Sequence, residues 1–305
     1  MRIGFTLPNV GPAAGPDGIR RAAERAEALG YDGLWVTERL LYPLKPRTPY
    51  PASADGSLPD AYRVVLDPLE SLTFAAAVTR RVTLGTSVLD MPFYNPVVLA
   101  RRLTTLDVLS GGRLRVGLGL GWSEDEFEAA GAARAERGRR ADEFLAVLKA
   151  VWTSDPVEYR GRYYRIPRSI IGPKPVQKPH PPIYLAAYVP RALERTARWA
   201  DGWNPAGVPV AGMRQMMAQL RDLAKAAGRE PAALQLVVRA NVALTDRPLG
   251  ADRAIFTGSP EQVKEDVDAV RGLGAAEVFF DPTFSPDGAT LDGFLASMER
   301  LRKLA

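Results

Sequence analysis

The sequence predicts a (β/α)8 barrel, also called a TIM barrel, which is an α/β fold in which eight parallel strands alternate with helices. Three observations predict it: eight short apolar segments, a helical segment after most of them, and a length of 305 residues. That length accommodates one such barrel with insertions. We therefore expect residues 1–305 to form a single domain, with insertions at about 40–65 and 153–181.

The first half of the chain contributes four strands and the helices between them. The strands are predicted at 2–7, 31–37, 82–88 and 113–119, and the helices at about 17–29, 67–78 and 95–109. Asp17 is a candidate N-cap, and Ser123 with Glu126 has the spacing of a capping box. One apolar face is predicted for the third helix, made of Val98, Leu99, Leu103, Leu106 and Leu109.

The second half repeats the alternation. Strands are predicted at 183–187, 201–205, 234–243 and 277–280, with helices at about 135–151, 190–200, 213–227, 259–273 and 290–304. Ser259 followed by Pro260 and Gln262 is typical of a capped helix start.

The two insertions differ in composition. Residues 40–65 are rich in proline and contain Tyr42, Tyr50 and Tyr62, which indicates a partly ordered lid. The second insertion contains an aromatic, hairpin-like stretch at 157–165 and then a run of prolines around His180. We interpret His180 as a spacer or packing residue.

Composition excludes several classes of site. The chain has no cysteine and one histidine, so a disulfide, a thiol nucleophile, a multi-histidine metal site and a histidine relay are not expected. The net charge of +5 is spread over mixed acidic and basic helix faces, which argues against a nucleic-acid partner. No apolar run approaches the ~18 residues of a membrane span, and the short first segment does not suit a signal peptide. We expect a cytoplasmic protein without a membrane partner.

In a barrel of this kind the chemistry lies at the carboxyl ends of the strands. These ends carry Glu38 with Arg39, Ser87 with Val88, residues 119–123, residues 186–191, and Asn204. The small residues at 85–87 either relieve crowding in the core or let a flat molecule approach the backbone. Together with a helix start after the fifth strand, they suit a planar cofactor that carries a phosphate.

Several stretches, in this order, resemble the bacterial luciferase-like family, and in particular its branch of oxidoreductases that use the deazaflavin coenzyme F420. They are 28–39 (ALGYDGLWVTER), 84–88 (LGTSV), 95–100 (NPVVLA), 106–113 (LDVLSGGR), 117–122 (GLGLGW), 173–177 (PKPVQ), 181–187 (PPIYLAA) and 200–203 (ADGW). The branch that uses FMN for monooxygenation shares most of these motifs.

The resemblance implies a bound F420, or alternatively FMN, and a homodimer. It implies a non-proline cis peptide at Ser87–Val88 behind the cofactor ring, and a phosphate site at the turn 186–191. The residues expected to contact the cofactor are Glu38, Thr86, Ser87, Val88, Gly119, Gly121, Trp122, Ala186, Ala187, Tyr188, Val189 and Arg191.

Two departures from the F420 branch bear on the reaction. An acid followed by His is common there, but the pair here is Glu38 and Arg39, and Arg39 cannot shuttle a proton. Relatives that oxidise alcohols or sugars carry a catalytic Glu where this chain has Trp122. Because Glu38, Arg39 and Trp122 occupy these positions, we take them as the catalytic candidates.

Three functions follow as hypotheses. The first is F420-dependent hydride transfer with a small organic substrate, as in the reduction of an activated double bond or imine, with the proton from Tyr42, Glu38 or water. The second is an FMN-dependent monooxygenase. The third is a flavin-binding barrel without turnover.

Overall fold

The computed structural model describes residues 1–53 and 55–305, and its centre is a closed parallel barrel. Each barrel strand pairs with the next along the chain, and the last pairs with the first. The barrel strands are β1 (Arg2–Thr6), β2 (Gly33–Val36), β3 (Thr83–Thr86), β5 (Leu114–Gly119), β8 (Ile183–Leu185), β9 (Gly202–Trp203), β10 (Gln235–Asn241) and β13 (Glu277–Asp281). The predicted (β/α)8 barrel is confirmed.

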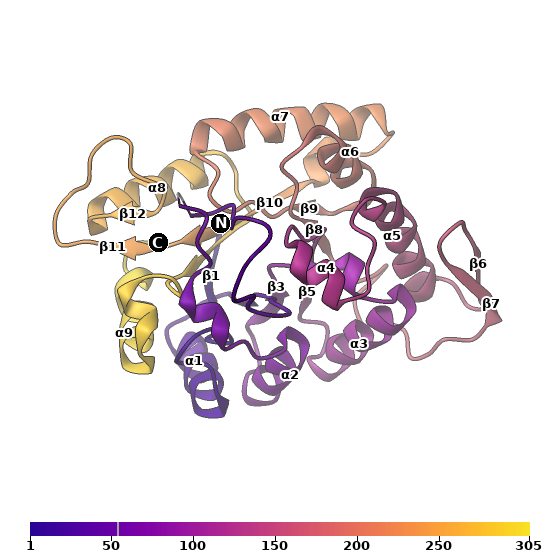
Figure 1. Ribbon diagram of the computed structural model, residues 1–305, viewed down its shortest axis with the longest axis horizontal. Coiled ribbons are helices and arrows are strands. Elements are labelled where there is room, and N and C mark those ends of the chain that lie inside the picture. Colours follow the sequence, from indigo (N-terminus) through magenta and orange to yellow (C-terminus); the bar gives the residue numbers. More distant parts are fainter. Residues whose placement is uncertain (54) are drawn as a thin grey trace.

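A ring of helices surrounds the barrel (Figure 1). The ring helices are α1 (Pro16–Ala28), α2 (Pro68–Val78), α3 (Pro96–Leu109), α5 (Arg137–Thr153), α6 (Pro190–Trp199), α7 (Val210–Ala226), α8 (Pro260–Gly272) and α9 (Leu291–Arg302). A short helix, α4 (Glu124–Ala129), follows β5, and a two-residue strand, β4 (Leu89–Asp90), pairs with the end of β5. Strands β11 (Ala243–Leu244) and β12 (Thr257–Gly258) form a separate small sheet.

Large aromatic side chains fill the barrel interior. Trp35 of β2 stacks on Phe279 of β13, with ring centroids 4.7 Å apart. Gly85 of β3 lies against the same indole, and a Cβ built on Gly85 would come within 2.3 Å of Trp35 Cε3. Of the two interpretations of the small residues at 85–87, relief of crowding therefore holds at Gly85, because the flat group against it is a core side chain.

Two of the helix-end predictions had different outcomes. The capping box at the start of α8 is confirmed, with Ser259 and Gln262 bonded reciprocally. The N-cap prediction for Asp17 is wrong. Helix α1 begins one residue earlier at Pro16, whose fixed φ suits a first helical turn, and Asp17 inside that turn bonds Arg20 instead.

The predicted apolar face of α3 is partly wrong. Leu99, Leu103 and Leu106 are buried, whereas Val98 and Leu109 are 57% and 63% exposed. At about 100° per residue, the three buried leucines share one stripe, and the other two lie roughly a quarter turn away from it. The barrel therefore covers a narrower stripe of α3 than the sequence pattern predicted.

The two insertions take different forms. In the second, β6 (Val157–Arg160) and β7 (Arg165–Ser169) pair as the expected hairpin, which projects beside α5 in Figure 1. His180 lies beside the Trp152 ring and contacts the carbonyl of Pro181, as a packing residue does. The first insertion, 40–53 with 55–66, is mostly irregular, includes a short 3₁₀ turn (Asp60–Arg63), and is called the cover here. Within the described residues, no helix has the length and apolarity to cross a membrane.

Candidate functional site

The floor of the barrel mouth is a hydrogen-bonded group at the carboxyl ends of β3, β9 and β10. Ser87 donates from Oγ to Asn204 Oδ1 at 2.7 Å. Arg239 donates from Nη1 to the carbonyl oxygen of Ser87 at 3.0 Å, and Asn204 donates to the carbonyl of Val237 at 2.8 Å. The Ser87–Val88 peptide bond is cis. These contacts fix the backbone of residue 87 from strands β9 and β10.

Arg239 forms a buried ion pair with Asp281 on the same floor. Their closest N–O distance is 2.5 Å, and the two side chains are 11% and 1% exposed. Burial alone would lower the pKa of Arg239, but the Asp281 carboxylate outweighs it and raises that pKa. The sequence analysis missed this pair. The signals were a charged residue inside an apolar strand, at 239, and an acid at the end of the last strand.

Arg39 stands at the rim of the mouth, between two aromatic rings. Its guanidinium carbon lies 4.9 Å from the Tyr62 ring centroid and 4.8 Å from that of Trp122. Nη1 donates to Glu126 Oε2 at 2.7 Å, and the two side chains are 7% and 2% exposed. Nε of Arg39 is buried and has no hydrogen-bond partner among the described residues. A buried donor without an acceptor is costly, so this atom calls for a ligand.

Glu126 was predicted to complete a capping box with Ser123, and that prediction is wrong. The Ser123 side chain makes no capping hydrogen bond. Glu126 turns instead toward β2, where it accepts from Arg39 and from the backbone N–H of Leu40 at 2.7 Å. Because this partner lies 87 residues away along the chain, a local spacing rule could not reveal it.

Glu38 lies beside Arg39 in the chain but forms a different cluster. One carboxyl oxygen accepts from the backbone N–H of Asp90 at 2.7 Å, and the other meets the hydroxyl of Tyr94. Burial, with Asp90 as a second cause, raises the pKa of Glu38 to about 8. Burial, with Glu126 as a second cause, raises the pKa of Asp90 to about 7. At neutral pH this cluster therefore holds protons that ordinary carboxyls would have lost.

Two glycines, one at the end of β5 and one just after it, lie against the cluster of Glu38 and Asp90. Gly121 donates its N–H to Asp90 Oδ1 at 2.8 Å, and its φ of +68° suits glycine. A Cβ on Gly119 would come within 2.6 Å of both Asp90 and Val88. Thr86 also serves the barrel wall, since its Oγ1 bonds the backbone of Gly117. Thr86, Gly119 and Gly121 therefore lie around the mouth, where they hold or make room for neighbouring parts of the barrel.

The turn at 186–191 lies on the other side of the mouth and leads into α6. Ala187 is buried, while Tyr188, Val189 and Arg191 are exposed. Pro190 occupies the first helical position as predicted. The free N–H groups of a helix start suit a phosphate, and this start is reachable from solvent.

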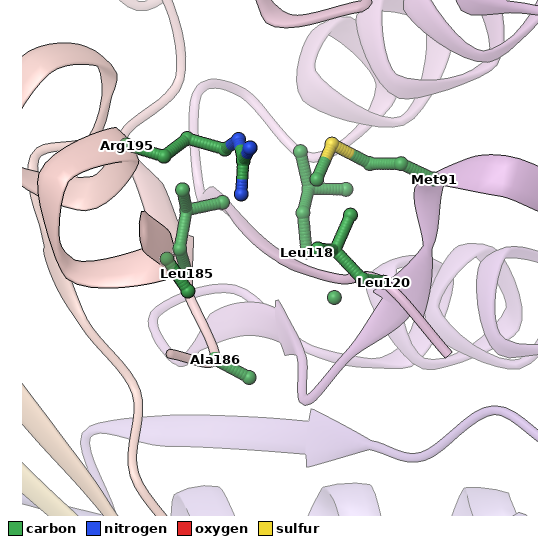
Figure 2. Close-up of a pocket in the computed structure, with 8 residues that line it drawn as sticks. Met91, Leu118, Leu120, Leu185, Ala186 and Arg195 are labelled. Atoms are coloured by element: carbon green, nitrogen blue, oxygen red, sulfur yellow. The ribbon is translucent and has the colours of Figure 1, made fainter. Parts of the chain in front are cut away.

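A small cavity lies beneath that turn (Figure 2). Its volume is about 10 Å³, room for one water molecule, and Arg195 of α6 reaches it from the side opposite Met91. Arg195 is bound to Asp142 at 2.8 Å. This cavity is far smaller than the several hundred Å³ that a flavin occupies.

The cover closes the mouth from above. Its residues Tyr50 and Tyr62 pack against each other, Tyr50 packs on Trp122, and Tyr62 packs on Phe284. Tyr62 is 4% exposed. Tyr42 instead turns its hydroxyl to Leu58 and Asp60 within the cover. The cover thus packs over the mouth through Tyr50 on Trp122 and Tyr62 on Phe284, and its role as a lid stays a prediction.

The strand ends thus bring predicted site residues together in three groups. Arg39 and Trp122 meet under the cover, Glu38 joins the Asp90 cluster, and Ser87 belongs to the floor. Glu126, Asp90, Tyr94, Arg239 and Asp281 complete these groups and were not among the predicted site residues. Among the described residues, no group of three or more His, Cys, Asp or Glu side chains is placed to hold a metal ion.

The chain is similar to several known proteins of one family. The family model described as luciferase-like monooxygenase matches residues 1–255. An uncharacterized protein of Mycobacterium tuberculosis is 38% identical over 213 residues, which cover 68% of this chain and 74% of that protein. The FMNH2-dependent dimethylsulfone monooxygenase of Pseudomonas putida is 32% identical over 225 residues, covering 72% of this chain and 60% of that enzyme.

A relative that uses the other cofactor is similar to the same degree. The F420-dependent glucose-6-phosphate dehydrogenase of Amycolatopsis mediterranei is 33% identical over 193 residues, covering 62% of this chain and 53% of that enzyme. Among solved structures, the monooxygenase RslO1 of Streptomyces bottropensis has the same fold, with a TM-score of 0.79, 24% identity, and coverage of 99% of this chain and 98% of that one. The chain belongs to the luciferase-like monooxygenase family, whose members include F420- and FMN-dependent oxidoreductases.

Proposed function

We propose that the protein is an F420-dependent oxidoreductase that reduces an activated double bond or imine in a small organic substrate. The observation that supports this function is the buried carboxyl cluster at the mouth, where Glu38 accepts from the backbone N–H of Asp90 and contacts the Tyr94 hydroxyl, and where burial raises the pKa of Glu38. Reduction consumes a proton, and a carboxyl group with a raised pKa can supply one. The single histidine lies away from the mouth, against Trp152, and does not take part.

One observation supports the fit of such a cofactor. The start of α6 lies at the mouth and is exposed to solvent, so its free N–H groups are available to a phosphate. We assign the ring to the space beside Ser87, Val88 and Trp122 after the cover moves. Residues 186–191 then hold the phosphate, and Gly119 and Gly121 leave room for Val88 and Asp90 beside the ring. When bound, the reduced deazaflavin supplies a hydride from its C5.

The protein's own part is to place the substrate and deliver the proton. Trp122 and the cover exclude water from the mouth, which strengthens every polar contact there. Glu38 holds the proton on its carboxyl group. Of the proton sources considered from the sequence, Tyr42 is disfavoured because its hydroxyl is turned to Asp60. The homodimer and the cytoplasmic location rest on the resemblance and the sequence, and sedimentation velocity tests the dimer.

The alternative is an FMN-dependent monooxygenase, which the similarity to the dimethylsulfone enzyme favours. Two assays under defined gas phases separate the functions. In the absence of oxygen, we expect reduced F420 to be oxidised when an enone or cyclic imine is added. Oxygen-dependent conversion of an organic substrate with reduced FMN and without F420 would establish the alternative. Binding of either cofactor without turnover of any substrate would favour a flavin-binding barrel.

A further inference from the structure

We propose that Arg39 recognises the substrate, and that it selects an uncharged carbonyl group conjugated to a double bond or an aromatic ring. The carbonyl oxygen accepts from the guanidinium edge that carries Nε. The proposed function supplies what is then done to the substrate, whereas the binding itself can be tested without a cofactor.

Arg39 has one edge whose N–H groups are not bound by Glu126. A guanidinium has five N–H donors, and the Nε–H and one Nη2–H point the same way along one edge. Only Nη1 is engaged by Glu126, at 2.7 Å, so the edge with Nε remains for a ligand. The rings of Tyr62 and Trp122 both pack against the guanidinium, with centroids 4.9 and 4.8 Å from its carbon. The N–H groups of the free edge point outward in the plane of the guanidinium, which suits the in-plane lone pairs of a carbonyl oxygen.

The charge balance around Arg39 gives the class of acceptor. Arg39 is already paired with Glu126, and Arg239 with Asp281, so each buried arginine has its own carboxylate. A ligand carboxylate would add an unmatched negative charge in a water-poor site beside Glu126, and that costs more than it gains. An uncharged carbonyl takes the vacant donor without this cost.

The surroundings of the edge give the shape. Tyr50, Trp122 and Phe284 belong to one aromatic cluster with Tyr62. Flat conjugated groups pack on such rings with more stabilisation than their area alone provides. Because Nε is enclosed in the structure, the cover must shift to admit the ligand, and the substrate then replaces part of the contacts that Tyr50 and Tyr62 make.

The test compares three probes of similar shape: indanone, indane and an indane carboxylate. Binding is measured by calorimetry on the full chain without cofactor, and in parallel the Nε–H signal of Arg39 is followed by NMR with labelled arginine. We expect indanone to bind about tenfold or more tightly than indane, as befits one hydrogen bond to a charged donor, and to shift the Arg39 Nε–H signal. Indane should leave that signal in place.

Two variants separate recognition from structure. Arg39→Lys keeps the charge beside Glu126 but removes the edge, and we expect it to bind indanone no better than indane. Arg63→Lys is the matched control, because Arg63 is an exposed arginine of the cover that pairs with Asp60 and stacks on Tyr42. It should retain the preference for indanone.

Several results would overturn the proposal. These are tighter binding of the carboxylate than of indanone, an unshifted Nε–H signal, an unchanged preference in Arg39→Lys, or no binding of any probe to the wild type. The NMR measurement uses only the wild-type chain, so it stands even if Arg39→Lys fails to fold. A separate titration with F420 and FMN tests the proposed function, and its failure would leave the probe preference untouched.

Discussion

At the scale of single residues, the mouth is controlled by carboxyl groups whose surroundings set their charge. Glu38, Asp90 and Glu126 lie on three different elements and all have a raised pKa, for which burial is the first cause. Only Glu126 has an arginine hydrogen-bonded to it. Glu38 and Arg39 are adjacent in the chain but belong to different groups. Glu38 holds a proton, and Arg39 offers an edge of hydrogen-bond donors.

The raised pKa of Glu38 predicts how stability depends on pH. The ordinary value is 4.5 and the folded value is about 8, so between these the folded chain holds a proton that the unfolded chain has released. Stability therefore falls as pH rises through this window. Glu38→Gln keeps the neutral form at every pH. We expect it to raise the free energy of unfolding near pH 8 by roughly 4 kcal/mol and to change it much less near pH 5.

Thermal or urea unfolding at the two pH values measures this effect. Glu24→Gln, at an exposed acid on α1 that pairs with Arg20, is the control and should show no such dependence. Asp90 keeps its own titration in Glu38→Gln, so a part of the slope should remain. A variant that is equally affected at both pH values would show that Glu38 does not hold a proton in the folded chain.

Gly85 predicts a local packing limit. A methyl group there would meet the Trp35 ring at 2.3 Å, and that ring is buried and stacked on Phe279. We expect Gly85→Ala to lower the free energy of unfolding by about 2 kcal/mol or more. Gly272→Ala, at the end of α8 with no atom within 4 Å of its added Cβ, should leave stability unchanged or raise it slightly. Equal stabilities for the two variants would mean that the barrel interior yields easily around Trp35.

At the scale of elements, the cover is fastened to the barrel by a surface cluster on α4. Arg47 donates to Asp125 at 3.0 Å and to the carbonyl of Glu124 at 3.1 Å, and it pairs with Glu128 at 2.5 Å. Thr48 accepts from the backbone N–H of Glu124 at 3.1 Å. Exposed ion pairs are weak and are screened by salt, so this attachment suits a segment that opens and closes.

Removal of this attachment should loosen the cover without unfolding the barrel. We expect Arg47→Ala to speed amide hydrogen exchange in residues 42–53, and moderate salt to have the same effect on the wild type. The matched control is Arg63→Ala, because Arg63 pairs with Asp60 inside the cover and does not tie it to α4. Identical exchange in both variants would show that the aromatic cluster alone holds the cover down.

The elements also show what a sequence can reveal. The strands and most helices were predictable because apolar periodicity and helix-end residues are local, as at Ser259 in α8. The contacts of Glu126 and Arg239 were not, because each depends on a partner brought near only by barrel closure. The Gly85 position was ambiguous for the same reason, since its neighbour Trp35 belongs to another strand. The packing of the cover on Trp122 and Phe284 was also beyond local rules.

At the scale of the whole molecule, a closed barrel gathers side chains from many chain segments at one end. Strands β2, β3, β5, β9, β10 and β13 each bring a residue to the mouth, and the cover and α4 close over them. The fold and the family are established, and the identity of the bound cofactor decides between the proposed reactions. Family members use F420 or FMN, as the similarity to one enzyme of each kind illustrates.

The most direct measurement is an equilibrium titration of the purified chain with F420 and, separately, with FMN, followed by cofactor fluorescence. The account predicts that F420 binds with one site per chain and more tightly than FMN. Binding of neither cofactor at micromolar concentration would contradict the oxidoreductase function, and tighter binding of FMN would replace F420-dependent reduction with the monooxygenase alternative.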